Sequence, residues 1–306
     1  MEGYERITFS FIAVCLILFL PPLLDGIARK IKAKVQLRQG ASIFQTYYDI
    51  MTFLSMEPVY PTERLSFRLA PYIAFASAVS AALVLPYGKV IPVSFTGDIF
   101  VFLYVLAMVS IAYMIGGFSL NNTYTNTGAN REMMIMLSIE PVLGVAIGTF
   151  ALNAHTLRMG AIPFAVTFTV SVLLAYALLA YSVYVEGGFI PFDVAEAEQE
   201  ILEGTFCEYS GYLLGIFKWA LMIKRFALLW LLSSFISIPP IRNVANGTLG
   251  GALILITQLI VLFLLYAGIA VIESMNARLR IDHIIRKNAG VFLCSLAVLA
   301  LAALGW

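Results

Sequence analysis

Carboxylates gather in one short segment of this 306-residue chain, between residues 186 and 212. The segment contains no lysine or arginine, and phenylalanine, isoleucine and glycine residues lie between its acids. Its seven carboxylates are Glu186, Asp193, Glu196, Glu198, Glu200, Glu203 and Glu208. Repulsion between like charges, or partial burial, raises the pKa of a carboxyl group toward neutrality. A group with such a pKa can accept and release protons during turnover, so the segment predicts acid–base chemistry.

The spacing of these acids predicts a shared surface. If the residues after Pro191 are helical, Glu196, Glu200 and Glu203 lie on one helix face, with Asp193 one turn earlier. We therefore expect a proton-responsive funnel lined by Glu196, Glu198, Glu200 and Glu203. The alternative is a solvated acidic loop without a chemical role. The apolar residues between the acids favour a half-buried segment over that alternative.

A second set of ionisable side chains interrupts long apolar stretches, where insertion of a charge costs about 2.5–3.5 kcal/mol. Glu140 precedes Pro141, and this proline predicts a locally opened helix that can hold water. The other candidates for a proton path are Glu132, Lys218, Lys224 and Glu273. Arg225 is expected to extend toward the membrane surface, and Asp25 is a minor candidate. The alternative is structural, with buried Glu–Lys or Glu–Arg pairs that hold helices together.

Transmembrane helices must position these residues. The chain is 61% hydrophobic and 12% charged, whereas soluble domains contain about 45–50% apolar and about 25% charged residues. A helix of about 20 apolar residues crosses the bilayer, which predicts an all-α polytopic protein with about eight spans and one membrane domain over residues 1–306. The expected spans are 8–28, 69–88, 99–118, 133–153, 161–185, 212–236, 248–272 and 290–306.

Lysine and arginine are distributed unevenly between the two sides of the predicted membrane protein. Twelve of them fall in the odd-numbered loops and only four on the other side. Cytoplasmic loops carry the excess of basic residues. We therefore expect three cytoplasmic loops (29–68, the acidic 186–212 and the basic 273–289), both termini outside, and location in the cell (plasma or inner) membrane.

Composition also argues against several functions. A net charge of +1 gives nucleic-acid binding no electrostatic support. The three cysteines lie far apart without a CxxC spacing, and the chain has only two histidines. A usual thiolate or imidazole metal site is therefore not expected in this chain, and redox metals, if involved, belong to partner proteins.

Three motifs carry a family resemblance. The run from Pro191 to Glu198, PFDVAEAE, followed by EYSG at 208–211, resembles the signature of the subunit 1 family of complex I. That family includes related subunits of energy-converting [NiFe] hydrogenases and formate hydrogenlyases. Residues 128–132 (GANRE) with Glu140–Pro141 resemble its second polar motif, and residues 273–282 (ESMNARLRID) its third. The resemblance covers nearly the whole chain.

Several details resemble the hydrogenase branch more than the quinone branch. Complex I has Asn-Arg-Pro before PFD and a proline inside PFDxPEAE, where this chain has residues 188–190 (GFI) and Ala195. Residues 45–50 and Lys218–Trp219 resemble the formate hydrogenlyase type. The family's Arg-Arg-Gly-Pro is here residues 38–41 (RQGA), which leaves Arg38 as the expected anchor.

The resemblance implies a noncatalytic anchoring and coupling subunit that holds no cofactor itself. Its implied partners are hydrogenase large and small subunits with a [NiFe] centre and iron–sulfur clusters, an iron–sulfur subunit, and antiporter-like membrane subunits. Implied contacts with the peripheral arm are Arg38, Arg131, Tyr209, Arg278 and Arg280. The alternatives are a quinone-chamber subunit of a complex I-type dehydrogenase, an autonomous ion transporter, and a purely structural anchor.

Overall fold

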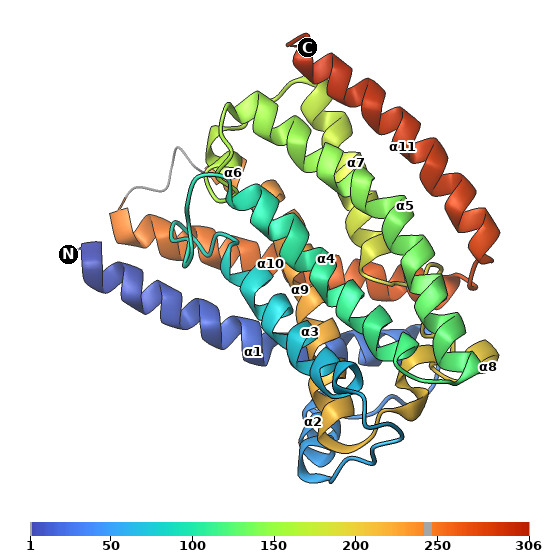
Figure 1. Cartoon of the computed structure of the whole chain (residues 1–306). Helices are drawn as coiled ribbons and strands as arrows, with labels where there is room; N and C mark the ends of the chain where they lie inside the picture. Colours follow the sequence, from blue (N-terminus) through green and yellow to red (C-terminus); the bar gives the residue numbers. More distant parts are fainter. Residues whose placement is uncertain (1, 242–246, 306) are drawn as a thin grey trace.

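The protein is built from α-helices that lie side by side (Figure 1). The computed structural model describes residues 2–241 and 247–305, and those residues form no β-strand beyond one isolated bridge between Tyr87 and Val90. The α-helices are α1 (Glu2–Val35), α2 (Gln45–Ser55), α3 (Leu65–Leu83), α4 (Asp98–Phe118), α5 (Thr123–Ala154), α6 (Ile162–Ala165), α7 (Val170–Glu186), α8 (Glu198–Ile201), α9 (Gly211–Ile241), α10 (Gly247–Met275) and α11 (Ile281–Ala303).

The membrane-spanning helices agree with the expected fold class. Seven helices are long and apolar enough to cross a bilayer, namely α1, α3, α4, α5, α9, α10 and α11. The apolar helix α7 has 17 residues and completes the expected set of eight. The prediction of an all-α, multi-pass membrane protein is confirmed. Several helices extend beyond the predicted spans, so only residues 276–280 separate α10 from α11.

The predicted continuous span over residues 161–185 is wrong. The chain forms the short helix α6, leaves the helical conformation at 166–169, and begins again with α7. Thr169 caps α7 by accepting a hydrogen bond from the backbone N–H of Val172. Both the backbone N–H and the hydroxyl of Thr167 donate to the side-chain oxygen of Asn153. These side chains supply the hydrogen bonds that a continuous helix would have formed within its backbone.

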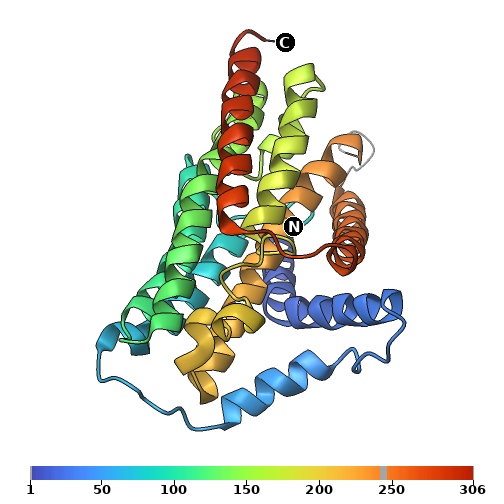
Figure 2. The ribbon, with the colours of Figure 1, turned by 90° about the vertical axis from the view of Figure 1, so that its right-hand side faces the viewer.

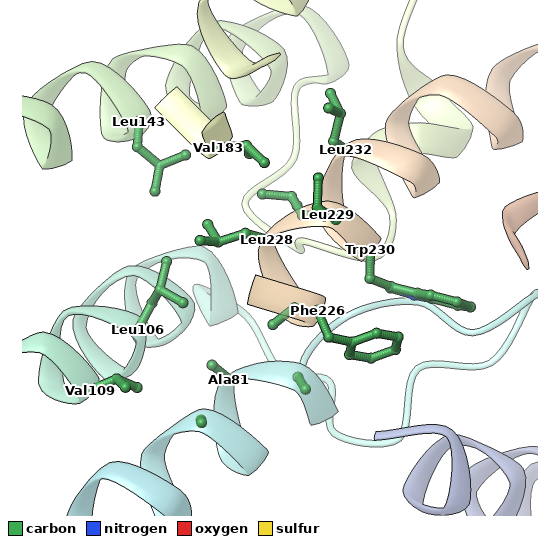
Figure 3. Packing of buried hydrophobic residues seen from close by; sticks show 14 of the residues in the cluster. Ala81, Leu106, Val109, Leu143, Val183, Phe226, Leu228, Leu229, Trp230 and Leu232 are labelled. Atoms are coloured by element: carbon green, nitrogen blue, oxygen red, sulfur yellow. The ribbon is translucent and has the colours of Figure 1, made fainter. Parts of the chain in front are cut away.

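Helix α9 forms the centre of the protein (Figures 1 and 3). Its residues from Phe226 to Leu231 are all buried at 0% exposure. Side chains from α3, α4, α5 and α7 surround them, as shown by Ala81, Leu106, Leu143 and Val183 in Figure 3. Helix α11, in contrast, packs mainly against α5 and leaves most of its surface to the surroundings. The charged residues of α9 therefore lie inside a helix that is enclosed by protein.

Three connections meet at one end of the protein. Helix α1 contains Pro21 and Pro22 and is bent (Figure 2), as expected where prolines remove backbone hydrogen bonds. Its last turns contact the end of α10, where Lys32 pairs with Glu273 at 2.6 Å. The segment between α7 and α9 contacts both the region after α2 and the loop between α10 and α11. This shared end brings the acidic segment together with basic residues from other helices.

Candidate functional site

The acidic segment between α7 and α9 is mostly irregular. Only α8 and the short 3-10 helix η1 (Gly204–Glu208) form within it. Leu202, Glu203 and Gly204 all have positive φ angles, so no helix continues through them. The prediction that Glu196, Glu200 and Glu203 share one helix face is therefore wrong. A Cβ at Gly204 would lie 2.4 Å from the carbonyl oxygen of Ala195, which shows how tightly the segment folds back on itself.

Four acids of the segment each pair with a cation from outside the segment, which has no basic residue of its own. Helices α5 and α9 and the α10–α11 loop supply these cations. The pairs are Asp193–Arg278 at 3.0 Å, Glu196–Arg225 at 3.5 Å, Glu200–Arg131 at 2.7 Å and Glu203–Lys218 at 3.3 Å. Arg131 also donates to the carbonyl oxygen of Val194 at 3.2 Å. These contacts hold the segment over the ends of the helices.

A cavity of about 390 Å³, here called the charged vestibule, opens among three of these pairs, Asp193–Arg278, Glu196–Arg225 and Glu203–Lys218. Acids and cations from several regions of the chain line it, including Asp25 and Arg29 of α1 and Asp49 of α2. Arg29 pairs with Asp25 at 3.2 Å and with Asp49 at 3.5 Å. The full lining is Asp25, Arg29, Thr46, Asp49, Ile50, Phe53, Asp193, Glu196, Glu203, Phe206, Lys218, Leu221, Met222, Arg225 and Arg278.

A smaller cavity of about 40 Å³ continues from the vestibule toward the membrane interior. The two cavities share Asp193, Glu196, Leu221 and Arg225 in their linings. The smaller one adds residues that lie deeper along the spans, among them Glu132, Glu186 and Lys224. Because they share these side chains, the two cavities lie next to each other and lead from the exposed end into the helix bundle.

Lys224 is the centre of a buried charged cluster. Its ammonium lies 2.6 Å from the carboxylate of Glu186 and 3.8 Å from that of Glu132, and it donates to the Ser110 hydroxyl at 2.6 Å. The Lys224 and Glu186 side chains are 5% and 3% exposed. We name Lys224, Glu132, Glu186 and Ser110 the Lys224 cluster. A buried pair of this kind has a high cost if one partner is removed.

Glu140 lies farther along α5 than the Lys224 cluster. It is close enough to interact electrostatically with Glu132, Glu186 and Lys224. Helix α5 remains helical through Pro141 rather than opening into a loop. Glu140 lines a separate, largely apolar cavity of about 300 Å³ between α4 and α5. The structure thus brings Glu132, Lys224 and Glu140 within electrostatic reach of one another.

Burial controls the protonation of Glu196. Removal from solvent raises the pKa of its carboxyl group from 4.5 to about 7, against the opposing charge of Arg225, while Asp193 and Glu132 add to the rise. The sequence predicts two causes for such a rise in pKa, repulsion between neighbouring acids and partial burial. Desolvation is the larger of the two at Glu196.

Other predicted site residues lie around this centre. Glu273 pairs with Lys32 and accepts the backbone N–H of Ile190 at 3.2 Å. Glu208 accepts a hydrogen bond from the Asn122 side chain at 2.5 Å and does not line the vestibule. The side chain of Glu198 lies outside the described part of the chain. Glu273 therefore anchors the acidic segment, whereas Glu208 is not part of the charged vestibule.

The predicted interface residues separate into exposed, half-buried and buried ones. Arg38 and Arg280 are exposed, but Arg131 and Arg278 hold carboxylates of the acidic segment. Tyr209 is 4% exposed, stacks on the Phe67 ring and donates its hydroxyl proton to the Phe67 carbonyl. The prediction of a partner contact for Tyr209 is wrong, because its aromatic ring belongs to the core.

Four residues have surroundings that differ from those expected or were not among the predictions. Glu186 belongs by sequence to the acidic loop, but it ends α7 and lies beside Lys224. Arg225 does not extend to the surface: it pairs with Glu196 and donates to the carbonyl oxygen of Gly187 at 2.9 Å. Asp25 and Arg29 are four residues apart on α1, and that spacing is a signal for an ion pair at the end of an apolar helix.

The sequence matches the NADH dehydrogenase family over residues 7–304. Formate hydrogenlyase subunit 4 of Escherichia coli is 31% identical over 285 residues, which cover 90% of this chain and 92% of that protein. Hydrogenase-4 component C of the same organism is 34% identical over 235 residues, or 73% of each chain. An NADH-quinone oxidoreductase subunit of Thermomicrobium roseum is 30% identical over 66% of this chain and 69% of that protein.

A solved structure shares the fold. A chain of the membrane-bound sulfane sulfur reductase, an archaeal respiratory membrane complex, superposes with a TM-score of 0.80 at 22% identity. The superposition covers 97% of this chain and 99% of the other. The relatives are components of multisubunit membrane complexes, so this multi-pass chain is a subunit that has partners.

Proposed function

This chain belongs to the NADH dehydrogenase family, and from that premise we propose that it anchors and couples an energy-converting [NiFe] hydrogenase or formate hydrogenlyase complex. In this role it catalyses no reaction itself. It links electron transfer in a peripheral arm to translocation of protons, or of sodium ions, across the membrane.

One observation carries the proposal: ionisable side chains continue from the charged vestibule through the Lys224 cluster to Glu140 inside the bundle. Charged groups at membrane depth are costly and mark ion or proton paths. Glu196 stands at the entrance with a pKa of about 7, so it exchanges protons near neutral pH. A change of charge at the vestibule alters the electrostatic balance of the Lys224 cluster, because Arg225 lies next to Lys224 and borders both cavities.

The partners in this proposal are hydrogenase large and small subunits, an iron–sulfur subunit and antiporter-like membrane subunits. The [NiFe] centre and the iron–sulfur clusters belong to those partners. Large apolar side chains are exposed around α2 at the charged end, which supports docking of a peripheral arm there. They are Leu37, Tyr48, Met51, Val59 and Leu65. The excess of basic residues at this end supports a cytoplasmic orientation in the plasma membrane, with the termini outside.

A quinone-chamber role is the second candidate, supported by the identity to a subunit of an NADH-quinone oxidoreductase. Nine of the 15 side chains that line the vestibule are charged, however. Pockets for small organic ligands are lined mainly by hydrophobic side chains with few polar groups. The vestibule is therefore better suited to water and protons than to an apolar ring and tail.

Purification of the tagged chain in mild detergent, with mass spectrometry and metal analysis, tests the proposal. Co-purifying nickel, iron and a hydrogenase large subunit is the expected result. Quinone without nickel would move the chain to the second candidate, and a metal-free chain without partners would contradict both.

The coupling role is tested in vesicles that contain the complex. Glu132→Gln removes one charge of the Lys224 cluster and should lower ion translocation per hydrogen evolved, while the subunits still co-purify. The matched control is Asp282→Asn, which neutralises an exposed carboxylate outside the vestibule. Equal translocation in both variants would contradict the coupling role and leave the structural anchor.

A further inference from the structure

A second large hollow lies at the end of the protein opposite the charged vestibule. It has a volume of about 800 Å³ and lies where α4 begins and α5 ends, with α11 at one side. We name it the α4–α5 trough. Its lining is mainly apolar and consists of Thr96, Gly97, Ile99, Phe100, Leu103, Gly144, Gly148, Ala151, Leu152, His155, Thr156, Leu157, Arg158 and Leu299.

Two glycines on α5 make the floor of the trough. A Cβ at Gly148 would meet no atom within 4 Å, and a Cβ at Gly144 would meet only the Leu103 side chain at 4.0 Å. These glycines lie one helical turn apart on one face of α5. The described chain therefore leaves this face uncovered, although both α4 and α11 pack against α5 beside it.

The trough extends toward the middle of α5. It shares Phe100 and Leu103 with the cavity of about 300 Å³ that Glu140 and Pro141 line. An occupant that enters at the end of α5 can thus continue along the helix toward Glu140. This long apolar shape suits an extended hydrocarbon chain.

Two basic side chains, a histidine and an arginine, lie at the outer end of the trough. His155 follows the last residue of α5, and Arg158 lies three residues later; both are exposed. Within the described residues, no carboxylate forms an ion pair with Arg158 at 4.0 Å or less. The nearby Asp98 is buried, accepts the backbone N–H of Met159 at 2.5 Å, and interacts with Arg158 electrostatically from beyond ion-pair distance. The Arg158 guanidinium is therefore available for an external anion.

We propose that the α4–α5 trough binds one anionic phospholipid from the leaflet on that side of the membrane. Its headgroup phosphate contacts Arg158 and His155, and an acyl chain lies over Gly144 and Gly148. An apolar transmembrane helix of a partner subunit would cover the glycines but would supply no anion to the exposed Arg158 guanidinium. The combination of an apolar trough with a basic end favours the phospholipid.

The inference also deepens the proposed function. An acyl chain that reaches the shared residues Phe100 and Leu103 excludes water from the adjacent side of Glu140. Protons at Glu140 would then exchange only through the Lys224 cluster. This consequence rests on the proposed function, whereas lipid binding itself does not.

Native mass spectrometry of the purified complex tests the lipid site. The complex is delipidated in detergent and then titrated with phosphatidylglycerol or phosphatidylcholine. We expect phosphatidylglycerol to be retained preferentially. Gly148→Leu should abolish that retention by filling the trough, and Arg158→Gln should remove the preference between the two lipids while weak binding persists.

Gly268→Leu is the matched control, because a Cβ at Gly268 of α10 also meets no atom within 4 Å. It should retain phosphatidylglycerol like the unmodified complex. A photocrosslinker at Leu152 provides the second measurement. A lipid adduct supports the proposal, whereas a polypeptide adduct, or equal lipid retention in the Gly148 and Gly268 variants, would overturn it. Both outcomes are independent of hydrogenase activity, so they do not depend on the proposed function.

Discussion

Two sets of ion pairs in this protein differ in their surroundings. Among the ion pairs that hold the acidic segment, Glu200 is 58% exposed and its partner Arg131 is 23% exposed. In the Lys224 cluster, Lys224 and Glu186 are almost completely buried. Exposed pairs contribute about 0–1 kcal/mol to stability, whereas breaking a buried pair costs about 3–5 kcal/mol.

This difference indicates a division of roles. The pairs that hold the acidic segment can exchange partners and protons at low cost, because water replaces a lost contact. The Lys224 cluster must keep its charges balanced, so a proton that enters or leaves has a large effect on its neighbours. In the proposed coupling role, a small change at the surface would become a strong change inside the membrane.

The largest effect is expected from Lys224→Ala. It leaves the Glu186 carboxylate buried beside Glu132 without a cation, which should destabilise the protein by about 3–5 kcal/mol. Thermal unfolding of the purified complex and its subunit content measure the loss. An unchanged unfolding temperature would show that water already solvates this cluster.

A smaller effect is expected where the acidic segment folds back. Gly204→Ala places a Cβ 2.4 Å from the Ala195 carbonyl oxygen at a φ of +58°, and the left-handed backbone alone costs about 1–2 kcal/mol. Faster hydrogen exchange across residues 193–208 is the expected result. Gly290→Ala, where a Cβ meets nothing within 4 Å, serves as the control. If protection persists in the Gly204 variant, the close contact with Ala195 is not required.

Glu196→Gln tests the pH dependence of the vestibule. Burial raises the pKa of Glu196 from 4.5 to about 7 in the folded protein, so its contribution to stability is present below pH 4.5 and is lost as the pH rises to about 7. The substitution should flatten this part of the stability curve. An identical pH curve for the variant would show that Glu196 titrates at its ordinary value.

The smallest effect is expected from Glu200→Gln, which removes the carboxylate that pairs with Arg131. Because Glu200 is 58% exposed, water can replace its contact with Arg131, and stability should change by less than about 1 kcal/mol. Chemical denaturation measures this change. A loss as large as that of Lys224→Ala would eliminate the distinction between the two sets of pairs.

The helices could be predicted from the sequence because long apolar runs determine membrane spans. The ion-pair partners of the acids could not be predicted, because they come from distant positions in the sequence. Arg131 and Glu200 are 69 residues apart, and Asp193 and Arg278 are 85 apart. The left-handed conformation of Leu202 and Glu203 could not be predicted either, since side chains of these types rarely adopt positive φ.

Neutralisation of the buried pair tests the central claim most directly. The double variant Lys224→Met with Glu186→Gln removes the two almost completely buried charges together. The charge that remains, on Glu132, belongs to a side chain that is 22% exposed. Its complex should assemble with normal stability. Hydrogen evolution and ion translocation are then measured in the same vesicles. We predict that translocation per hydrogen evolved falls to background, and a ratio equal to that of the unmodified complex would contradict the coupling role of the Lys224 cluster.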